Sequence, residues 1–445
     1  MSVADDSRTA GAARGAAPAP GTAAPGAGAA RTGATAAPGA GATRTGATAA
    51  APLTRRHARR EVDPATIPAS GAWREGDDPG PRRFADIGAL PLEAGGRLPH
   101  VRLAYETWGE LNEAGDNAVL VLHALTGDAH VTAHPGDQSD DEGWWGQVVG
   151  PGRAIDTTKY FVVAPNVLGG CQGSTGPSSP APDGSPWGSR FPVLTVRDQV
   201  AAEIELADLL GIERWALVVG ASMGGHRVLE WAVMAPERVD AIAVVATNAQ
   251  ASAEQVAWAH SQLGAIRLDP NWRGGDYYDA APGHGPHAGL GLARQIAHTT
   301  YRSPAELEER FGRLPQHAEE PLSGGRYAVQ SYLDHHASKL AVRFDAGSYV
   351  ALTQTMITHD VGRDRGGVEA ALAQVRAATL VVAVDSDRLF FPDESERIAA
   401  AVPGAGPVAY VRSDHGHDGF LVEHDQVAAL VGRFLRSVAP VRPAR

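Results

Sequence analysis

The residues Gly220-Ala221-Ser222-Met223-Gly224 have the types and spacing to present a serine hydroxyl as a nucleophile. An apolar run at 215–219 precedes them, and a helix is predicted at 226–234. A serine on such a sharp strand-to-helix turn stands clear of its sheet, and the two glycines leave room where a side chain would collide with a neighbouring element. Backbone N–H groups at the helix start then point at a developing oxyanion. Glycine and serine are common in ordinary loops, so it is the flanking strand and helix that favour a nucleophile.

A serine nucleophile needs a histidine that takes its proton and a carboxylate that holds the imidazole. Asp385 and Asp387 follow an apolar run at 379–384, and His415 and His417 follow the last apolar run, at 408–411. Serine, aspartate and histidine therefore occur in the chain order of the α/β-hydrolase architecture. The pattern alone leaves open which carboxylate and which imidazole would act.

The elements that must position these groups alternate along the chain. We predict strands at 101–105, 118–123, 160–165, 215–219, 241–246, 379–384 and 408–411, with helices at 196–210, 226–234 and 425–438. This alternation indicates an α/β fold with a mostly parallel sheet flanked by helices. The acids Asp198, Glu203, Glu205 and Asp208 are expected on a solvated face of the 196–210 helix.

The alternation of strands and helices stops between residues 247 and 375, where helices are predicted at 252–263, 289–299, 304–311, 327–337 and 348–355. We interpret 247–375 as a helical lid insertion in a core made of 83–246 and 376–440. Residues 1–60 are rich in Ala, Gly and Pro, and no aromatic residue precedes Trp73. Such a segment cannot bury enough apolar surface to offset its ordering entropy, which predicts a disordered low-complexity tail rather than a transit peptide.

Composition excludes several classes of function. The net charge of −12 argues against a nucleic-acid partner, and no segment has the apolar length of a membrane span. The single cysteine, Cys171, rules out an intramolecular disulfide and favours a reducing compartment. Cys171 lies in the glycine-rich loop 166–177, which has neither a dinucleotide-binding nor a phosphate-binding pattern, and no adjacent histidine marks it as a nucleophile.

From about Arg83 to its end, the chain resembles the homoserine O-acetyltransferase family of α/β-hydrolase-fold acyltransferases. The similar stretches are Leu-Ala-Tyr-Glu-Thr-Trp-Gly-Glu-Leu-Asn at 103–112, His-Ala-Leu-Thr-Gly-Asp at 123–128, the loop 166–177, Ser-Met-Gly-Gly at 222–225, Leu-Glu-Trp at 229–231, Asp-Pro-Asn-Trp at 269–272, Thr-Tyr-Arg-Ser at 300–303, Arg-Phe-Asp at 343–345, Ser-Asp-Arg at 386–388 and Gly-His-Asp at 416–418. The chain departs from the family pattern at Ala221, His226 and Gly347.

The resemblance implies a role for particular residues. It implies Ser222, Asp387 and His417 as the catalytic triad, and the backbone N–H groups of Leu125 and Met223 as the oxyanion hole. It also implies that homoserine is recognised by three further residues, namely Arg294, Tyr301 and Asp418.

The implied reaction moves an acetyl group from acetyl-CoA to the hydroxyl of L-homoserine through an acyl-serine, a step of methionine biosynthesis. Acetyl-CoA is then a co-substrate, and no bound cofactor or metal is expected. The resemblance further implies a cytoplasmic homodimer. The alternatives are a succinyl- or propionyl-CoA donor, serine as the acceptor, or an ester hydrolase on the same fold.

Overall fold

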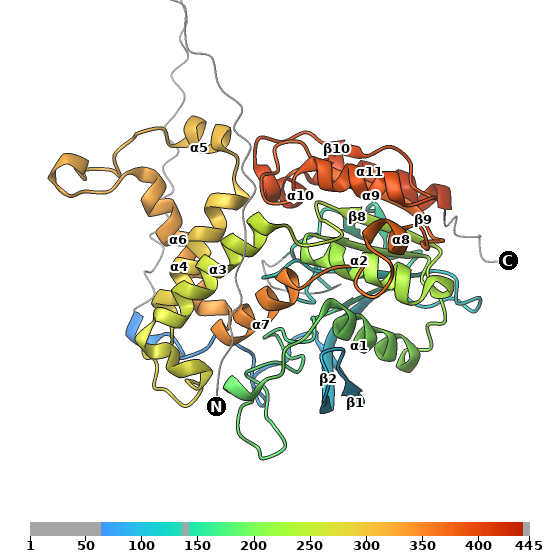
Figure 1. Cartoon of the computed structure of the whole chain (residues 1–445), viewed down its shortest axis with the longest axis horizontal. Coiled ribbons are helices and arrows are strands. Elements are labelled where there is room, and N and C mark those ends of the chain that lie inside the picture. The colour runs from blue at the N-terminus through green and yellow to red at the C-terminus, as the bar shows by residue number, and fades with distance from the viewer. Residues whose placement is uncertain (1–63, 135, 137–141, 439–445) are drawn as a thin grey trace, which may run out of the picture. The chain divides into compact units, whose positions relative to one another are not determined.

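A sheet of eight strands lies at the centre of the described chain (Figure 1), in the order β1-β2-β6-β3-β7-β8-β9-β10. β2 pairs antiparallel with β1 and with β6, and the remaining neighbours in the sheet are parallel. These strands are β1 (Arg83–Pro91), β2 (Arg97–Trp108), β3 (Ala118–Leu122), β6 (Phe161–Pro165), β7 (Leu217–Ala221), β8 (Ala241–Val245), β9 (Ala378–Val384) and β10 (Ala409–Val411), and a separate parallel pair is formed by β4 (Val149–Gly150) and β5 (Ile155–Asp156).

The structure is a computed structural model that describes residues 64–134, 136 and 142–438. The predicted tail, residues 1–60, lies outside the described residues, as do residues 439–440 of the predicted core. The described residues all belong to one compact unit, which holds every element named here.

Side chains alternate between the two faces of the sheet, as strand geometry requires. On β3, Leu120 and Leu122 join the core beneath α1 (Val196–Leu209) and α2 (Met223–Met234). Val119 and Val121 join the opposite core, beneath α11 (His424–Val438). All five β3 residues are buried, which explains the nearly continuous apolar run in the sequence. The predicted α/β fold with a mostly parallel sheet flanked by helices is therefore confirmed.

The solvated face predicted for α1 is wrong for two of its four acids. Asp198 and Glu203 are both only 3% exposed. Asp198 accepts hydrogen bonds from the N–H groups of Thr195 and Glu93, which caps the helix. Glu203 pairs with Arg227 of α2 at 2.6 Å and accepts from the indole N–H of Trp231 at 2.8 Å. A buried carboxylate is tolerated because each of its oxygens has a charged or N–H partner.

The chain between β8 and β9 is helical. It contains α3 (Ala253–Leu268), α4 (His287–Tyr301), α5 (Pro304–Arg310), α6 (Ala328–Arg343), α7 (Ala346–Ile357) and α8 (Val368–Leu372), and α9 (Pro392–Ala401) and α10 (Gly419–Val422) follow later in the chain. α3, α4 and α6 lie beside one another to one side of the sheet (Figure 1).

A separate apolar core joins these helices to the chain segments that follow β3 and β7. It includes Ile266 of α3 and Leu290 of α4, together with Leu125 and Met223, which follow β3 and β7. The helical segment is therefore packed against Met223, which follows Ser222, and against Leu125.

Candidate active site

Ser222 stands at the turn between β7 and α2 in a strained conformation, with φ 56° and ψ −124°. Two glycines make this turn possible. A Cβ on Gly224 would lie 2.1 Å from the carbonyl oxygen of Leu122 on β3, and a Cβ on Gly220 would lie 2.6 Å from the backbone of Gly224. The glycines therefore let α2 start directly against the sheet, which lifts the serine hydroxyl above the strand ends.

A row of two hydrogen bonds connects Ser222 to a carboxylate. His417 Nε2 lies 2.9 Å from Ser222 Oγ, and His417 Nδ1 lies 2.7 Å from Asp387 Oδ2. His417 lies on the turn Gly416–Asp418, and Asp387 lies in the loop after β9. The other oxygen of Asp387 accepts from the N–H groups of Leu389 and Phe390, at 2.8 and 3.0 Å. The carboxylate is thereby fixed with one oxygen aimed at the imidazole.

The surroundings of His417 set its basicity. Burial alone would lower the pKa of this imidazole, but the adjacent Asp387 carboxylate outweighs burial and raises the pKa above its ordinary value. An imidazole held between a serine hydroxyl and a buried carboxylate can take the serine proton and return it.

The competing residues of the sequence lie elsewhere. Asp385 accepts from the N–H of Ser413 at 3.0 Å and pairs with Arg412 at 3.2 Å, so it ties the β9 loop to the chain after β10. His415 Nδ1 lies 3.2 Å from a guanidinium nitrogen of Arg302. Among the described residues no hydrogen bond joins Asp385 or His415 to Ser222, and it is Asp387 and His417 that form the row.

The backbone around the nucleophile offers two amide donors. Met223 N–H is the first of α2, where helix N–H groups have no partner within the helix. Leu125 follows β3, in a turn closed by the bond from Gly127 N–H to the carbonyl of Ala124 at 2.9 Å. Among the hydrogen bonds of the described chain, neither amide donates to a protein acceptor. Leu125 is 7% exposed and Met223 is fully buried.

Arg294, Tyr301 and Asp418 gather beside His417. The ring of Tyr301, at the end of α4, lies 5.8 Å from the imidazole, and the Arg294 guanidinium lies 5.4 Å from the Tyr301 ring centre. Asp418 follows His417 in the chain, and its side chain is 15% exposed. A cation, a hydroxyl and a carboxylate thus lie near the imidazole that contacts Ser222.

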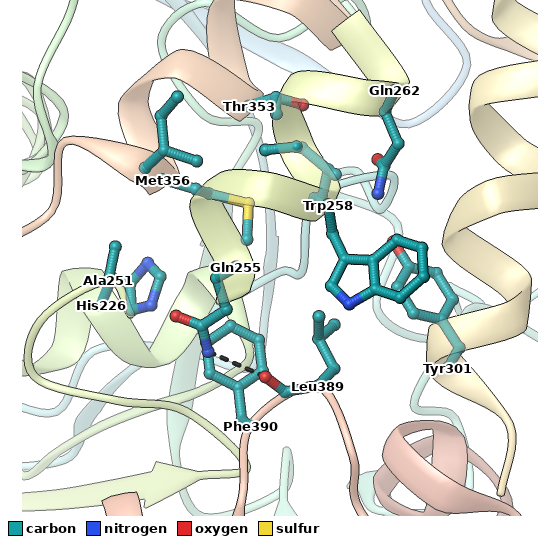
Figure 2. A pocket seen from close by; sticks show the side chains of 13 residues that line it. His226, Ala251, Gln255, Trp258, Gln262, Tyr301, Thr353, Met356, Leu389 and Phe390 are labelled. Atoms are coloured by element: carbon teal, nitrogen blue, oxygen red, sulfur yellow. Dashed lines mark hydrogen bonds between the residues drawn. The ribbon is translucent and has the colours of Figure 1, made fainter. Parts of the chain in front are cut away.

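An apolar pocket adjoins this group (Figure 2). Leu125 and Tyr301 contribute to its lining, and side chains of α3 and α7, including Trp258, Thr353 and Met356, form its wall. Gln255 of α3 donates to the carbonyl of Leu389 at 2.8 Å, the bond drawn as a dashed line in Figure 2. The helical segment therefore supplies part of the lining of a pocket that Leu125 also lines.

His226 is a lining residue that replaces an apolar side chain of the family pattern. Its Nε2 lies 2.8 Å from the side-chain oxygen of Asn248, and its ring stacks on His359 with the centroids 4.3 Å apart. Burial lowers the pKa of His226 to about 4, so the ring is neutral at pH 7. It contributes no positive charge to the pocket.

Cys171 is buried, and burial raises the pKa of its thiol. A protonated, buried thiol is a poor nucleophile, as expected from the sequence. Within residues 64–134, 136 and 142–438, no group of three or more His, Cys, Asp or Glu side chains could hold a metal ion. No helix in the same ranges has both the length and the apolar character needed to cross a membrane.

Arg302 was not singled out from the sequence. Its Nε lies 3.2 Å from Asp418 Oδ2, and its side chain is 13% exposed. The neighbouring Tyr301 was selected by resemblance, and the only available signal for Arg302 was its place in the same Thr-Tyr-Arg-Ser stretch.

Comparisons with known proteins agree with this geometry. A family model described as alpha/beta hydrolase fold matches residues 117–424. A homoserine O-acetyltransferase of Thermobifida fusca is 60% identical over 370 residues, which cover 83% of this chain and 97% of the relative. The chain belongs to the homoserine O-acetyltransferase family.

Solved structures connect this acyltransferase family with esterases. The crystal structure of a homoserine O-acetyltransferase from Bacillus anthracis superposes with a TM-score of 0.74 at 26% identity, covering 81% of this chain and 99% of that one. The structure of esterase E22 superposes with a TM-score of 0.73, also at 26% identity, covering 80% and 99%. The homoserine O-acetyltransferase fold is thus shared with hydrolases, and the fold alone does not choose between transfer to an alcohol and transfer to water.

Proposed function

We propose that the protein transfers an acetyl group from acetyl-CoA to the hydroxyl of L-homoserine through an acetyl-Ser222 intermediate. The observation that carries the proposal is the row Ser222–His417–Asp387, with contacts of 2.9 and 2.7 Å, in a chain 60% identical to a homoserine O-acetyltransferase. The product is O-acetylhomoserine, which belongs to amino-acid biosynthesis.

In the first half-reaction, Ser222 Oγ attacks the thioester carbonyl while His417 Nε2 takes the hydroxyl proton. The oxyanion that forms is stabilised by the N–H groups of Leu125 and Met223, and removal of one such donor typically costs about 2.7–4 kcal/mol of barrier. The C–S bond then breaks, and the CoA sulfur leaves with the proton held by His417.

In the second half-reaction, His417 takes a proton from the homoserine hydroxyl, which attacks the acetyl carbon. The ester bond to Ser222 breaks, and the proton returns to the serine oxygen. The acceptor is oriented at its other end. Arg294 suits its carboxylate because a guanidinium binds carboxylates bidentately, Tyr301 adds a hydroxyl, and Asp418 suits the ammonium.

The helical segment 247–375 acts as a lid in this proposal. Acyl transfer must outcompete hydrolysis, so water has to be limited at the acetyl-Ser222 ester. The apolar pocket between α3, α7 and Leu125 supports this role, because its wall comes from the segment. None of the residues that line the pocket is an arginine or a lysine, which favours an uncharged acetyl or propionyl group over succinyl.

A second candidate is hydrolysis of acetyl esters, which the similarity to esterase E22 favours. The two reactions share the first half and differ in what attacks the acyl-serine. The cluster of Arg294, Tyr301 and Asp418 supports transfer, because water as acceptor needs neither a cation nor a carboxylate beside His417.

The test is CoA release by purified protein with acetyl-CoA or succinyl-CoA, and with homoserine, serine or no acceptor. Wild type is compared with Ser222→Ala. We expect rapid acetyl transfer to homoserine that Ser222→Ala abolishes. Release that ignores the acceptor would identify a hydrolase, and preference for succinyl-CoA or serine would change the substrates but keep the mechanism. Undiminished transfer by Ser222→Ala would refute the acyl-serine.

We also propose that the protein is a cytoplasmic homodimer. Exposed apolar side chains on the helical segment support an interface there, with Leu268 of α3 84% exposed and Leu292 of α4 49% exposed. Light scattering of wild type and Leu292→Glu tests the dimer, and a monomeric wild type would refute it. A single reduced cysteine fits a cytoplasmic enzyme, and cell fractionation tests the location.

A further inference from the structure

Arg302 contacts two residues close to the catalytic His417 in the chain, His415 and Asp418. Its Nε lies 3.2 Å from Asp418 Oδ2, and another of its nitrogens lies 3.2 Å from His415 Nδ1. Since a guanidinium can only donate, His415 accepts at Nδ1 and carries its proton on Nε2. The side chain reaches this turn from the end of α4, directly after Tyr301.

Asp418 has an unusual environment for a carboxylate that is 15% exposed. Arg302 Nε has the distance of an ion pair but lacks the geometry of a hydrogen bond. Among the described residues, no N–H or O–H group makes a hydrogen bond to Asp418, and the groups that act on it act through charge. Buried carboxylates are nearly always hydrogen-bonded, and Asp418 has no such bond from the described residues. Its oxygens can therefore accept hydrogen bonds from a ligand.

The charges around Asp418 oppose one another. Burial raises the pKa of Asp418, and the nearby Asp387 also raises it, whereas Arg302, His417 and Arg294 lower it. Arg302 is the largest of the lowering influences. Without it, a proton on Asp418 would relieve the burial of its charge, and the residue would no longer attract a cation.

We propose that Arg302 is a positioning residue for the acyl acceptor, which keeps Asp418 ionised and oriented so that its free oxygens bind the acceptor's ammonium group. The inference rests on the proposed function and extends it to the amino-group selectivity of the second half-reaction. The ammonium has three N–H donors, and no described group donates a hydrogen bond to the Asp418 carboxylate. Among the described residues Arg302 makes no hydrogen bond or ion pair with Ser222 or Asp387, so its loss should affect the first half-reaction much less than the second.

The experiment compares Arg302→Gln, Arg302→Lys and the control Arg310→Gln with wild type. Arg302 also lies 3.8 Å from a carboxylate oxygen of Glu306. Arg310 is the matched control because it too pairs with Glu306, at 3.3 Å, and makes no ion pair with Asp418. Three experiments are run on each variant. They give the burst of CoA release from acetyl-CoA, KM and kcat with L-homoserine, and kcat/KM with 4-hydroxybutanoate, an acceptor that lacks the amino group.

We expect Arg302→Gln to keep the CoA burst within about threefold of wild type and to raise KM for homoserine about tenfold or more, because a buried charge loses its partner. Its kcat/KM with 4-hydroxybutanoate should change little. The ratio of kcat/KM with homoserine to kcat/KM with 4-hydroxybutanoate should therefore fall. Arg302→Lys should restore most of that preference, and Arg310→Gln should behave as wild type.

Two results would overturn the inference while acetyl transfer by wild type stands. One is an unchanged preference for homoserine in Arg302→Gln. The other is an equal loss of burst and of transfer to both acceptors in Arg302→Gln and Arg302→Lys, which would make the residue a structural clamp only. A wild type that transfers no acyl group to homoserine would instead refute the proposed function, and this inference with it.

Discussion

Replacing Gly224 with alanine tests whether the geometry of the nucleophile turn is what activates Ser222. The added Cβ would lie 2.1 Å from the carbonyl oxygen of Leu122, whereas real Cβ atoms essentially never approach closer than 3.0 Å. The start of α2 and the end of β3 must therefore separate by at least 0.9 Å, which is 3.0 minus 2.1. Neither backbone can swing aside as a flexible side chain would.

This separation acts where the reaction takes place. Leu122 precedes the Leu125 amide by three residues, and Gly224 follows Ser222 by two, so the shift changes the distance between nucleophile and oxyanion donor. A misplacement of about 1 Å can cost about 10²-fold in rate, and overpacking typically costs about 1–3 kcal/mol of stability. We expect Gly224→Ala to lose about 10²-fold in kcat/KM and about 1–3 kcal/mol of unfolding free energy.

The control is Gly264→Ala in the interior of α3, where an added Cβ meets nothing within 4 Å. Alanine is the better helix former, so this variant should be about 0.5–1 kcal/mol more stable than wild type, with full activity. Urea denaturation measures the stability, and CoA release with homoserine measures the activity. A Gly224→Ala protein that unfolds and turns over like wild type would refute the reasoning.

Further predictions concern charge. The acid limb of the pH–rate profile should lie above the ordinary imidazole pKa of about 6.5, because His417 must be neutral to act as base and its pKa is raised. Asp387→Asn removes the carboxylate that raises the pKa of His417, so the acid limb should move to lower pH while kcat falls about 10⁴-fold. The control, Asp385→Asn, should leave the acid limb in place. The pH–rate profiles of both variants test this prediction. Arg227→Met leaves the Glu203 carboxylate buried without its 2.6 Å partner and should cost about 3–5 kcal/mol in urea denaturation. A loss below about 1 kcal/mol would contradict that account of the pair.

The nucleophile turn and the sheet could be predicted because their constraints are local. A Cβ at Gly220 or Gly224 would lie 2.6 or 2.1 Å from the backbone of the same turn or of the neighbouring strand, so glycine is required at this spacing around the serine. The five consecutive buried residues of β3 likewise form an apolar run because both faces of the sheet are covered. Asp387 and His417, by contrast, were separated from Asp385 and His415 only by resemblance, since both pairs follow strand ends.

The environment of α1 could not be predicted because its partners are distant in sequence. Glu203 is buried only because Arg227 and Trp231, on α2, reach its two oxygens. An acid at a helical spacing is the same in the sequence whether it faces water or an arginine of another helix. Asp198 did leave a local signal, since Thr195 precedes it by three residues as in a capping box.

The strand β1 could not be predicted because most of its residues are exposed or half-buried at a sheet edge, which leaves no apolar run in the sequence.

The end of α4 connects the residues proposed to bind the acceptor with the turn that carries the proposed catalytic base, His417. Ser303 Oγ–H donates to the carbonyl of Asp414, and a Cβ on Gly416 would lie 2.5 Å from the carbonyl oxygen of Tyr301. The turn that carries His417 is thus packed on the same helix end that presents Tyr301 and Arg302. A shift of α4 would therefore displace Tyr301, Arg302 and the His417 imidazole together. An acceptor that binds at the end of α4 would then also hold the proposed general base in position. A hydrolase has no need for this coupling, because water carries no second group by which it can be held.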